Sequence, residues 1–276
     1  MPTKSKNTVS NKSIYYSILV LLIGILCSSN IYRTALSNEK ADTVNKLQQH
    51  AATNAKDIET EFRRSFFQVS AVANLFASST WVTNAEFVAF INRVFPDFPE
   101  GRRLTSIQRV PVDNANEFIA KIRENPGTEY SHFSIFNFTS TDQVIAPQAI
   151  DGLYSVISYT YPEIKNLNFI GKNISADSTI GSLIYPVMAS EYPIVSNFSR
   201  PVKVIQDEPF VLHIYPILTT NPQNLVAQNV AGVIVSNQRI HSLFSNTLLN
   251  DEVEKFKYVI SDQQNTHYYY PEKIDH

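Results

Sequence analysis

The sequence predicts an α+β protein in which a membrane-spanning helix and a long stalk helix precede a region of antiparallel strands and shorter helices. Three observations support this fold class. Residues 13–32 form an uncharged apolar run, residues 36–76 contain neither proline nor glycine and repeat with a helical period, and helical and strand-like patterns alternate after residue 83. Such a mixture of helices and antiparallel strands is typical of an α+β domain.

Composition limits the classes of protein to which the chain can belong. With 276 residues, of which 43% are hydrophobic, it can bury one core of fair size or two small ones. The net charge of −2 offers no basic surface for phosphates, so we expect no nucleic-acid partner. The single cysteine, Cys27, lies within the apolar run, so we expect neither disulfides nor thiol chemistry elsewhere.

The apolar run SIYYSILVLLIGILCSSNIY is predicted to span a membrane. Its 20 residues, at about 1.5 Å each, cover the ~30 Å hydrocarbon layer. Lysines and no acidic residues precede it, and charges of both signs follow, so the positive-inside rule places residues 1–12 in the cytoplasm. A cleaved signal peptide is the weaker alternative, because the run is long and CSSN is a poor cleavage site. We assign a transmembrane helix to residues 13–35, as the single span of a protein of the cytoplasmic (inner) membrane with its body in the periplasm.

Residues 36–78 are predicted to form one stalk helix. Apolar or small residues recur at steps of three and four from Leu47 to Phe76, close to the repeat of a coiled coil. Ala51 and Ala55 bury little apolar surface, so the first half of the stalk needs a partner helix, and we expect a homodimer through the stalk. A solvated amphipathic helix within the fold is an equal alternative. The second half is rich in phenylalanine and is expected to lie on a globular domain.

Helices and strands alternate after the stalk. Thr83 and Glu86 have the spacing of a capping box, and the helix that they begin ends before Pro96. The later predicted elements are, in chain order, a strand over 103–112, a helix over 114–125, strands over 130–138 and 154–161, a helix around 178–190, strands over 202–205, 210–218 and 230–236, a helix over 238–250, and a strand over 256–261.

The sequence lacks the motifs of catalysis and of metal binding. Its six histidines have no ligand spacing and no cysteine to pair with them, so we expect no metal. The stretch FIGKNIS fails as a phosphate loop, because Asn166 stands where the motif needs glycine and Asn173 where it needs serine or threonine. No nucleophile elbow is present. We therefore expect neither an enzyme nor a bound cofactor.

Three stretches carry a family resemblance. The first is VTNAEFVAFINRVFPDFPEGRRLTSIQRVPV, with an EF-x-x-F helix and a strand that ends in a V-P turn; the second is YSVISYTYPEIKNLNFIGKNISADSTIGSLIYPVMASEYPIVS; the third comprises FVLHIYPIL and VAGVIVSNQRIHSLFSNTLL. In this order, over about residues 76–250, they resemble the CHASE family of extracytoplasmic sensor domains. Ala115 and Ile119 stand where many members have Arg and Glu, so the chain resembles a divergent member.

The resemblance implies two PAS-like antiparallel-sheet subdomains on the stalk, the membrane-distal one holding a small molecule. It assigns a CHASE-like sensor domain to residues 79–250 and a membrane-proximal tail to residues 251–276, where no second span is present. It also implies a sensory input domain that acts on a cytoplasmic transmitter, a diguanylate cyclase or a histidine kinase, absent from this chain. The alternative is an anchored interaction ectodomain that acts through a partner protein without a small ligand.

Five residues are the candidates for binding a ligand of unknown identity: Tyr154, Tyr159, Asn173, Val195 and Ser196. Alternation along YSVISYTY places Tyr154 and Tyr159 on opposite faces of a strand, and Tyr159 is equally compatible with a pocket and with the core. The other three come from the resemblance. Asn173 stands where an aspartate contacts the purine in the plant cytokinin receptors, and it lacks that charge, so cytokinin is not the expected ligand. Gly171 is predicted to form a turn that presents Asn173.

Overall fold

The computed structural model describes residues 11–99, 101–126, 128–138, 143–162, 169–175, 180–196, 210–221, 224–240, 242, 258–261 and 267–270. The strand predicted over residues 202–205 and most of the helix predicted over residues 238–250 lie outside these residues. The chain divides into two compact units, Met1–Lys56 and Asp57–His276.

The described part of the first unit is helix α1 (Asn11–Ser78), which continues into the second unit without a break. α1 is long and apolar enough to cross a membrane, and none of its most apolar window is buried. The helical predictions for the membrane segment and for the stalk are confirmed as one continuous element. The boundary between span and stalk stays a prediction.

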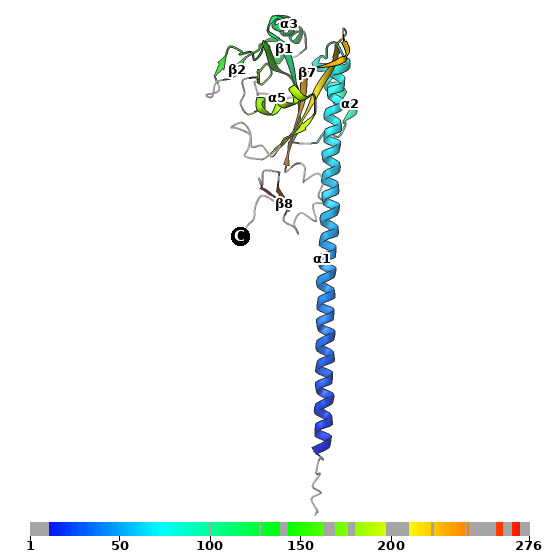
Figure 1. Cartoon of the computed structure of the whole chain (residues 1–276). Coiled ribbons are helices and arrows are strands. Elements are labelled where there is room, and N and C mark those ends of the chain that lie inside the picture. The colour runs from blue at the N-terminus through cyan, green and yellow to red at the C-terminus, as the bar shows by residue number, and fades with distance from the viewer. Residues whose placement is uncertain are drawn as a thin grey trace, which may run out of the picture. The chain divides into compact units, whose positions relative to one another are not determined.

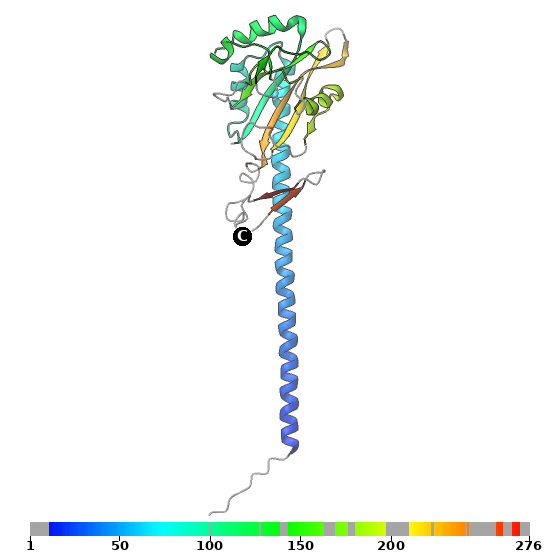
Figure 2. The same cartoon turned by 90° about the vertical axis from the view of Figure 1, so that its left-hand side faces the viewer.

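The second unit contains a five-stranded antiparallel sheet with the strand order β4-β1-β7-β6-β5 (Figures 1 and 2). Its strands are β1 (Arg102–Pro111), β4 (Leu153–Tyr161), β5 (Ile194–Val195), β6 (Phe210–Asn221) and β7 (Asn224–Arg239). Two smaller sheets pair β2 (Asn137–Phe138) with β3 (Val144–Ile145), and β8 (Tyr258–Ser261) with β9 (His267–Tyr270). The helices are α2 (Asn84–Val94), α3 (Ala115–Arg123), α4 (Thr128–Ser131) and α5 (Ile180–Ser190), with a 3-10 turn at η1 (Val112–Asn114). The predicted α+β class is confirmed, and the strands β3, β5 and β9 were not expected.

Helices cover both faces of the five-stranded sheet. The C-terminal part of α1 packs on one face with α2 and α3, and α5 packs on the other, so that α1 and α5 lie on opposite sides of β7 (Figure 1). Along β7, Ile234 belongs to the first of these cores, whereas Val233 and Val235 belong to the second, as the period of two in a strand requires. A strand buried on both faces reads as a continuous apolar run, which explains the stretch VAGVIVS.

The aromatic second half of the stalk lies on this sheet, as its sequence predicts. The ring of Phe62 stacks on His213 at a centroid distance of 5.5 Å, and Phe66 meets Tyr215 edge-on at 5.5 Å. Further along α1, Val69, Val72 and Phe76 are buried in the first core. These residues make the end of α1 part of the second unit's core.

The strand predicted over residues 130–138 is wrong for most of its length. Residues 128–131 form α4, and only Asn137 and Phe138 are in a strand. The alternation in the sequence is nevertheless real burial, because Phe133, Ile135 and Asn137 are all buried. The extended segment does not join a long strand. It pairs with residues 171–173, where the Phe136 N–H donates to Gly171 O at 3.1 Å.

Candidate ligand pocket

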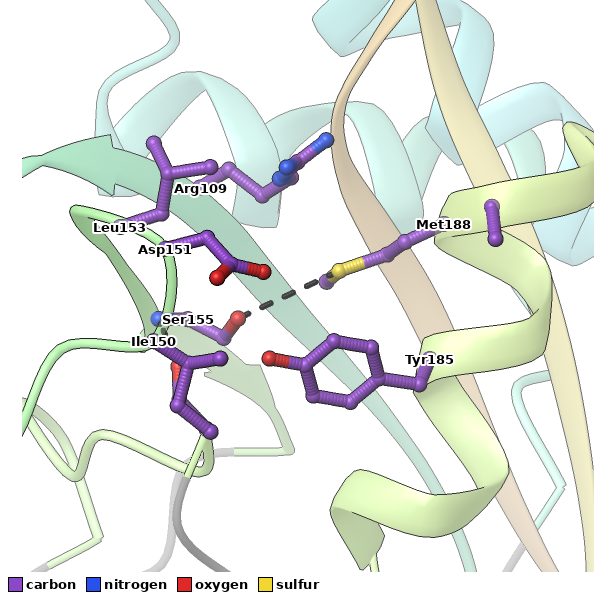
Figure 3. A pocket seen from close by; sticks show the side chains of 9 residues that line it. Arg109, Ile150, Asp151, Leu153, Ser155, Tyr185 and Met188 are labelled. Atoms are coloured by element: carbon purple, nitrogen blue, oxygen red, sulfur yellow. Dashed lines mark hydrogen bonds between the residues drawn. The ribbon is translucent and has the colours of Figure 1, made fainter.

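A pocket of about 120 Å³ lies between β4, the turn that precedes it and α5 (Figure 3). Its lining comes from β1, the turn, β4, the segment after residue 169 and α5: Arg109, Ile150, Asp151, Leu153, Ser155, Ser175, Tyr185, Met188 and Ala189. Pockets for drug-sized ligands measure roughly 300–1,000 Å³. This one therefore suits a small molecule, of the order of ten non-hydrogen atoms or fewer.

Polar and apolar side chains share the lining of the pocket, and three of the polar groups converge in it. Figure 3 shows the carboxylate of Asp151 and the hydroxyls of Ser155 and Tyr185 directed toward the same space. The Ser155 hydroxyl has a weak partner in Met188 Sδ at 4.0 Å. Apolar walls with a few convergent polar groups are the usual form of a small-molecule site.

The backbone holds Asp151 in place. Ile150 and Leu153 exchange two backbone hydrogen bonds of 3.0 Å, which close a two-residue turn. Its central residues, Asp151 and Gly152, have φ of 53° and 72°, as in a type I′ hairpin turn. Asp tolerates this left-handed conformation better than most residues, so the carboxylate projects from a well-defined position.

Asn173 lies behind the pocket wall, and its side chain is fully buried. Its Oδ1 accepts from the backbone N–H groups of Ser155 at 2.9 Å and Ser175 at 3.2 Å, and both of these residues line the pocket. Its Nδ2 donates to Asn137 Oδ1 at 3.1 Å and to Gln148 O at 2.7 Å. An amide has two donors and two acceptor sites, so these bonds use its full capacity.

The predicted turn at Gly171 is confirmed. Its φ is +90°, and a Cβ there would lie 2.1 Å from the backbone oxygen of Ser134. Only glycine fits this conformation and this close approach. The turn brings Asn173 to its partners within the domain.

The two tyrosine candidates share one face of β4, contrary to the simple alternation expected from the sequence. A register shift opposite Ser106 and Ile107 leaves Ser158 unpaired, which is a β-bulge. The extra residue turns Tyr159 to the face of Tyr154, and both pack against the first core, away from the pocket. Ser155 faces the pocket instead.

Tyr159 has the surroundings of a core residue. Its side chain is fully buried among the rings of Phe76, Phe87 and Tyr130. Its hydroxyl donates to Val82 O at 2.9 Å, and burial raises the pKa of this phenol.

The remaining candidates lie at the edge of the sheet. Val195 is exposed on β5, and Ser196 exchanges hydrogen bonds with Leu212 through its backbone N–H at 2.8 Å and its Oγ at 3.0 Å. Neither lines the pocket. The structure does not gather the five candidates into one site, and their role in binding a ligand stays a prediction.

A family comparison decides what kind of domain this is. The family profile described as the CHASE domain matches residues 81–269, which is more than half of the chain. The chain belongs to the CHASE domain family. The CHASE domain is a sensory domain and not a catalytic one, so the sensory character expected from the sequence is confirmed.

Two solved structures are similar to the CHASE domain chain at low identity. The ligand-binding domain of the Pseudomonas aeruginosa PAO1 amino acid chemoreceptor PctC, solved in complex with GABA, is 11% identical with a TM-score of 0.43, covering 79% of this chain and 71% of that one. The periplasmic sensory domain of the Campylobacter jejuni chemoreceptor Tlp1 is 13% identical with a TM-score of 0.36, covering 74% and 63%. No curated protein matches the chain.

Sequence reasoning about this CHASE domain located the neighbourhood of the pocket and missed its lining. Ser155 lies within the stretch singled out, and Asn173 supports it from behind. Arg109 and Tyr185 carry no local motif, since their meeting depends on how β1 and α5 pack. The Asp151-Gly152 dipeptide was a usable signal, because such a pair before a strand predicts a hairpin turn.

A buried arginine joins the sheet of the CHASE domain to α1. Arg102, on β1, donates from Nη2 to Ser65 O at 2.9 Å, from Nη1 to Gln68 Oε1, and from Nε to Ser236 Oγ at 2.9 Å. Burial lowers the pKa of its guanidinium to about 10, so it is charged at neutral pH. The guanidinium thus bonds the stalk helix and β7 at once.

Proposed function

We propose that this CHASE domain binds a small molecule outside the cytoplasmic membrane, in the pocket beside α5, and passes the signal through α1 to a cytoplasmic transmitter of the diguanylate cyclase or histidine kinase type. One observation carries this proposal. Strand β1 contributes Arg109 to the pocket and, seven positions earlier, Arg102 to the bonds with α1.

The connection from pocket to stalk runs along one strand, β1, and through the hydrogen bonds of Arg102. A ligand that binds the Arg109 side chain can shift β1, which carries it. Arg102 holds the same strand to Ser65 and Gln68 of α1 by hydrogen bonds. A ligand shifts an equilibrium only by its difference in affinity for two states. The proposal therefore requires two arrangements of β1 against α1 that bind the ligand unequally.

The proposed membrane arrangement is consistent with a signal that passes from the sensor domain toward the cytoplasm. The apolar window of α1 is the proposed span, with residues 1–12 in the cytoplasm, and the stalk is proposed to dimerise. α1 then connects the sensor to the membrane as a single helix.

A ligand screen on the full chain in lipid nanodiscs tests the proposal. Unfolding is followed by the fluorescence of Trp81, the single tryptophan, against a library of sugars, nucleobases, amines, carboxylic acids and amino acids. We expect at least one compound to raise the melting temperature in a concentration-dependent way. If no compound does so, the small-ligand function is overturned. A protein that co-purifies in fixed ratio would then favour an interaction ectodomain.

A further inference from the structure

Two opposite charges line the pocket without neutralising each other. Arg109 reaches it from β1 and Asp151 from the turn before β4. Within the described part of the chain, Arg109 makes one long hydrogen bond, from Nη1 to Val230 O at 3.3 Å, and Asp151 has no ion pair. Asp151 is exposed and Arg109 is half-buried, so a ligand that enters the pocket can reach both charges. Such a ligand can pair with each charge without breaking an existing ion pair.

The carboxylate end of the pocket is built to accept hydrogen bonds. The Asp151 carboxylate, the Ser155 hydroxyl and the Tyr185 hydroxyl converge there from the turn, β4 and α5 (Figure 3). An ammonium group has three donors and no acceptor, and it matches three converging oxygens, one of them ionised. Met188 and Ile150 provide apolar surface beside this group.

The guanidinium of Arg109 supplies the complementary end. Its planar fork of N–H groups binds a carboxylate through two parallel hydrogen bonds. A simple amine would leave Arg109 unpaired, a simple carboxylic acid would meet the charge of Asp151, and a neutral base would leave both charges unpaired. A molecule with one ammonium and one carboxylate satisfies both residues.

We propose that the pocket binds a small zwitterion, an amino acid with its ammonium on Asp151, Ser155 and Tyr185 and its carboxylate on Arg109. This assignment rests on the proposed function, since it names the class of ligand for the same site. The volume of about 120 Å³ restricts the ligand to compact amino acids.

The test is isothermal titration calorimetry of the full chain in lipid nanodiscs against each of the twenty proteinogenic L-amino acids. For every amino acid that binds, the matching amine and the matching carboxylic acid are titrated as well; for L-alanine these are ethylamine and propionate. We expect at least one amino acid to bind and both of its one-charge analogues to bind at least tenfold more weakly.

Variants then assign the binding to the two charges. Asp151→Asn keeps a residue suited to the left-handed turn and removes the charge, and Arg109→Gln removes the guanidinium. Each is expected to weaken the amino acid at least tenfold while the melting temperature of the free protein stays unchanged. Asp113→Asn and Arg93→Gln make the same chemical changes at exposed positions on η1 and α2 and are expected to bind as the wild type does.

The outcomes separate the two proposals. If a library compound binds but no amino acid does, or if binding is insensitive to Asp151→Asn and Arg109→Gln, the zwitterion assignment is overturned and the sensory function stands. If no compound binds at all, both are overturned. If Arg109→Gln lowers the melting temperature of the free protein, Tyr185→Phe is used in its place, because the Tyr185 side chain is partly exposed and the loss of its hydroxyl should not affect folding. If both Tyr185→Phe and Asp151→Asn then bind the amino acid with full affinity, the assignment is refuted.

Discussion

At the scale of single residues, His213 has a buried imidazole beside the positive charge of Arg102. Its side chain is 1% exposed and, among the described residues, neither ring nitrogen has a hydrogen-bond partner. Burial first, and the nearby Arg102 charge second, lower its pKa to about 4. The folded state therefore holds this histidine neutral, whereas the unfolded chain protonates it near pH 6.5.

This difference predicts a pH-dependent loss of stability. Between pH 6.5 and 4 the unfolded state binds more protons, so the contribution of His213 is complete above pH 6.5 and declines as the pH falls. We expect the free energy of unfolding to drop by about 2 kcal/mol between pH 7.5 and 5.0 from this group. Urea unfolding of the full chain in detergent, followed by Trp81 fluorescence, measures it. His213→Phe should remove most of that drop and exposed His132→Gln should not; equal slopes in all three proteins would contradict the prediction.

Asn173 gives a second prediction at this scale. Because its four hydrogen bonds lie within the domain, Asn173→Ala should destabilise the protein by about 2–4 kcal/mol. Asn116→Ala, at an exposed position of α3, should change stability by less than about 0.5 kcal/mol. Urea unfolding compares the two. If Asn173→Ala instead left stability unchanged and weakened ligand binding, Asn173 would contact the ligand directly, as the family resemblance implies.

Individual residues were predictable where local chemistry fixes them. The turn at Gly171 and the capping box at Thr83 follow from residue type and spacing alone, and the Glu86 carboxylate accepts from the Thr83 N–H at 2.8 Å as expected. The face of Tyr159 was not predictable, because the bulge at Ser158 depends on how β4 pairs with β1.

At the scale of elements, the contact between α1 and the sheet depends on Arg102. Arg102→Leu would leave the Gln68 amide, the Ser65 carbonyl and the Ser236 hydroxyl without their donor, and Arg102→Lys cannot reproduce the fork. We expect each variant to lower the free energy of unfolding by at least about 2 kcal/mol. Hydrogen exchange should show faster exchange in the part of α1 that follows residue 57.

The matched control for Arg102→Lys lies on α1, the helix that Arg102 contacts. Arg63 forms an ion pair with Glu59 at 2.8 Å, but its side chain is 79% exposed. Arg63→Lys should therefore change stability by less than about 0.5 kcal/mol. If Arg102→Lys behaved like Arg63→Lys, the buried guanidinium would not hold α1 to the sheet.

Elements were predictable where periodicity and pairing agree. The strands β1, β4, β6 and β7 and the helices α2, α3 and α5 coincide with predicted segments, because each has a clear apolar period or run. The segment over residues 130–138 has the alternating burial of a strand but does not form a long strand, because its backbone hydrogen bonds are made with residues 171–173. The period of apolar residues predicts which side chains are buried, but it does not predict the hydrogen-bond partners of the backbone.

At the scale of the whole molecule, the folding unit and the family domain begin at different places. The family match starts at residue 81, whereas the compact unit starts at Asp57. Residues 57–80, which belong to the compact unit but not to the family match, contain the part of α1 that buries Val69, Val72 and Phe76 against the sheet. Burying one such side chain contributes roughly 1.5–3 kcal/mol, so three contribute on the order of 5–9 kcal/mol. Ordering this part of α1 costs conformational entropy, so its net contribution to stability is smaller than this sum.

Two truncated chains test this relation. A chain that begins at Asp57 keeps the buried face of α1 and should be soluble, with a cooperative thermal transition followed by Trp81 fluorescence. A chain that begins at residue 79 exposes the sheet face that α1 covers and should aggregate or unfold without a cooperative transition. The second chain also lacks Ser65 and Gln68, so Arg102 keeps a charge in an apolar face without these two partners. A cooperative transition at the same temperature in both chains would mean that α1 contributes nothing to the core, and the route from pocket to stalk through β1 would then lose its physical basis.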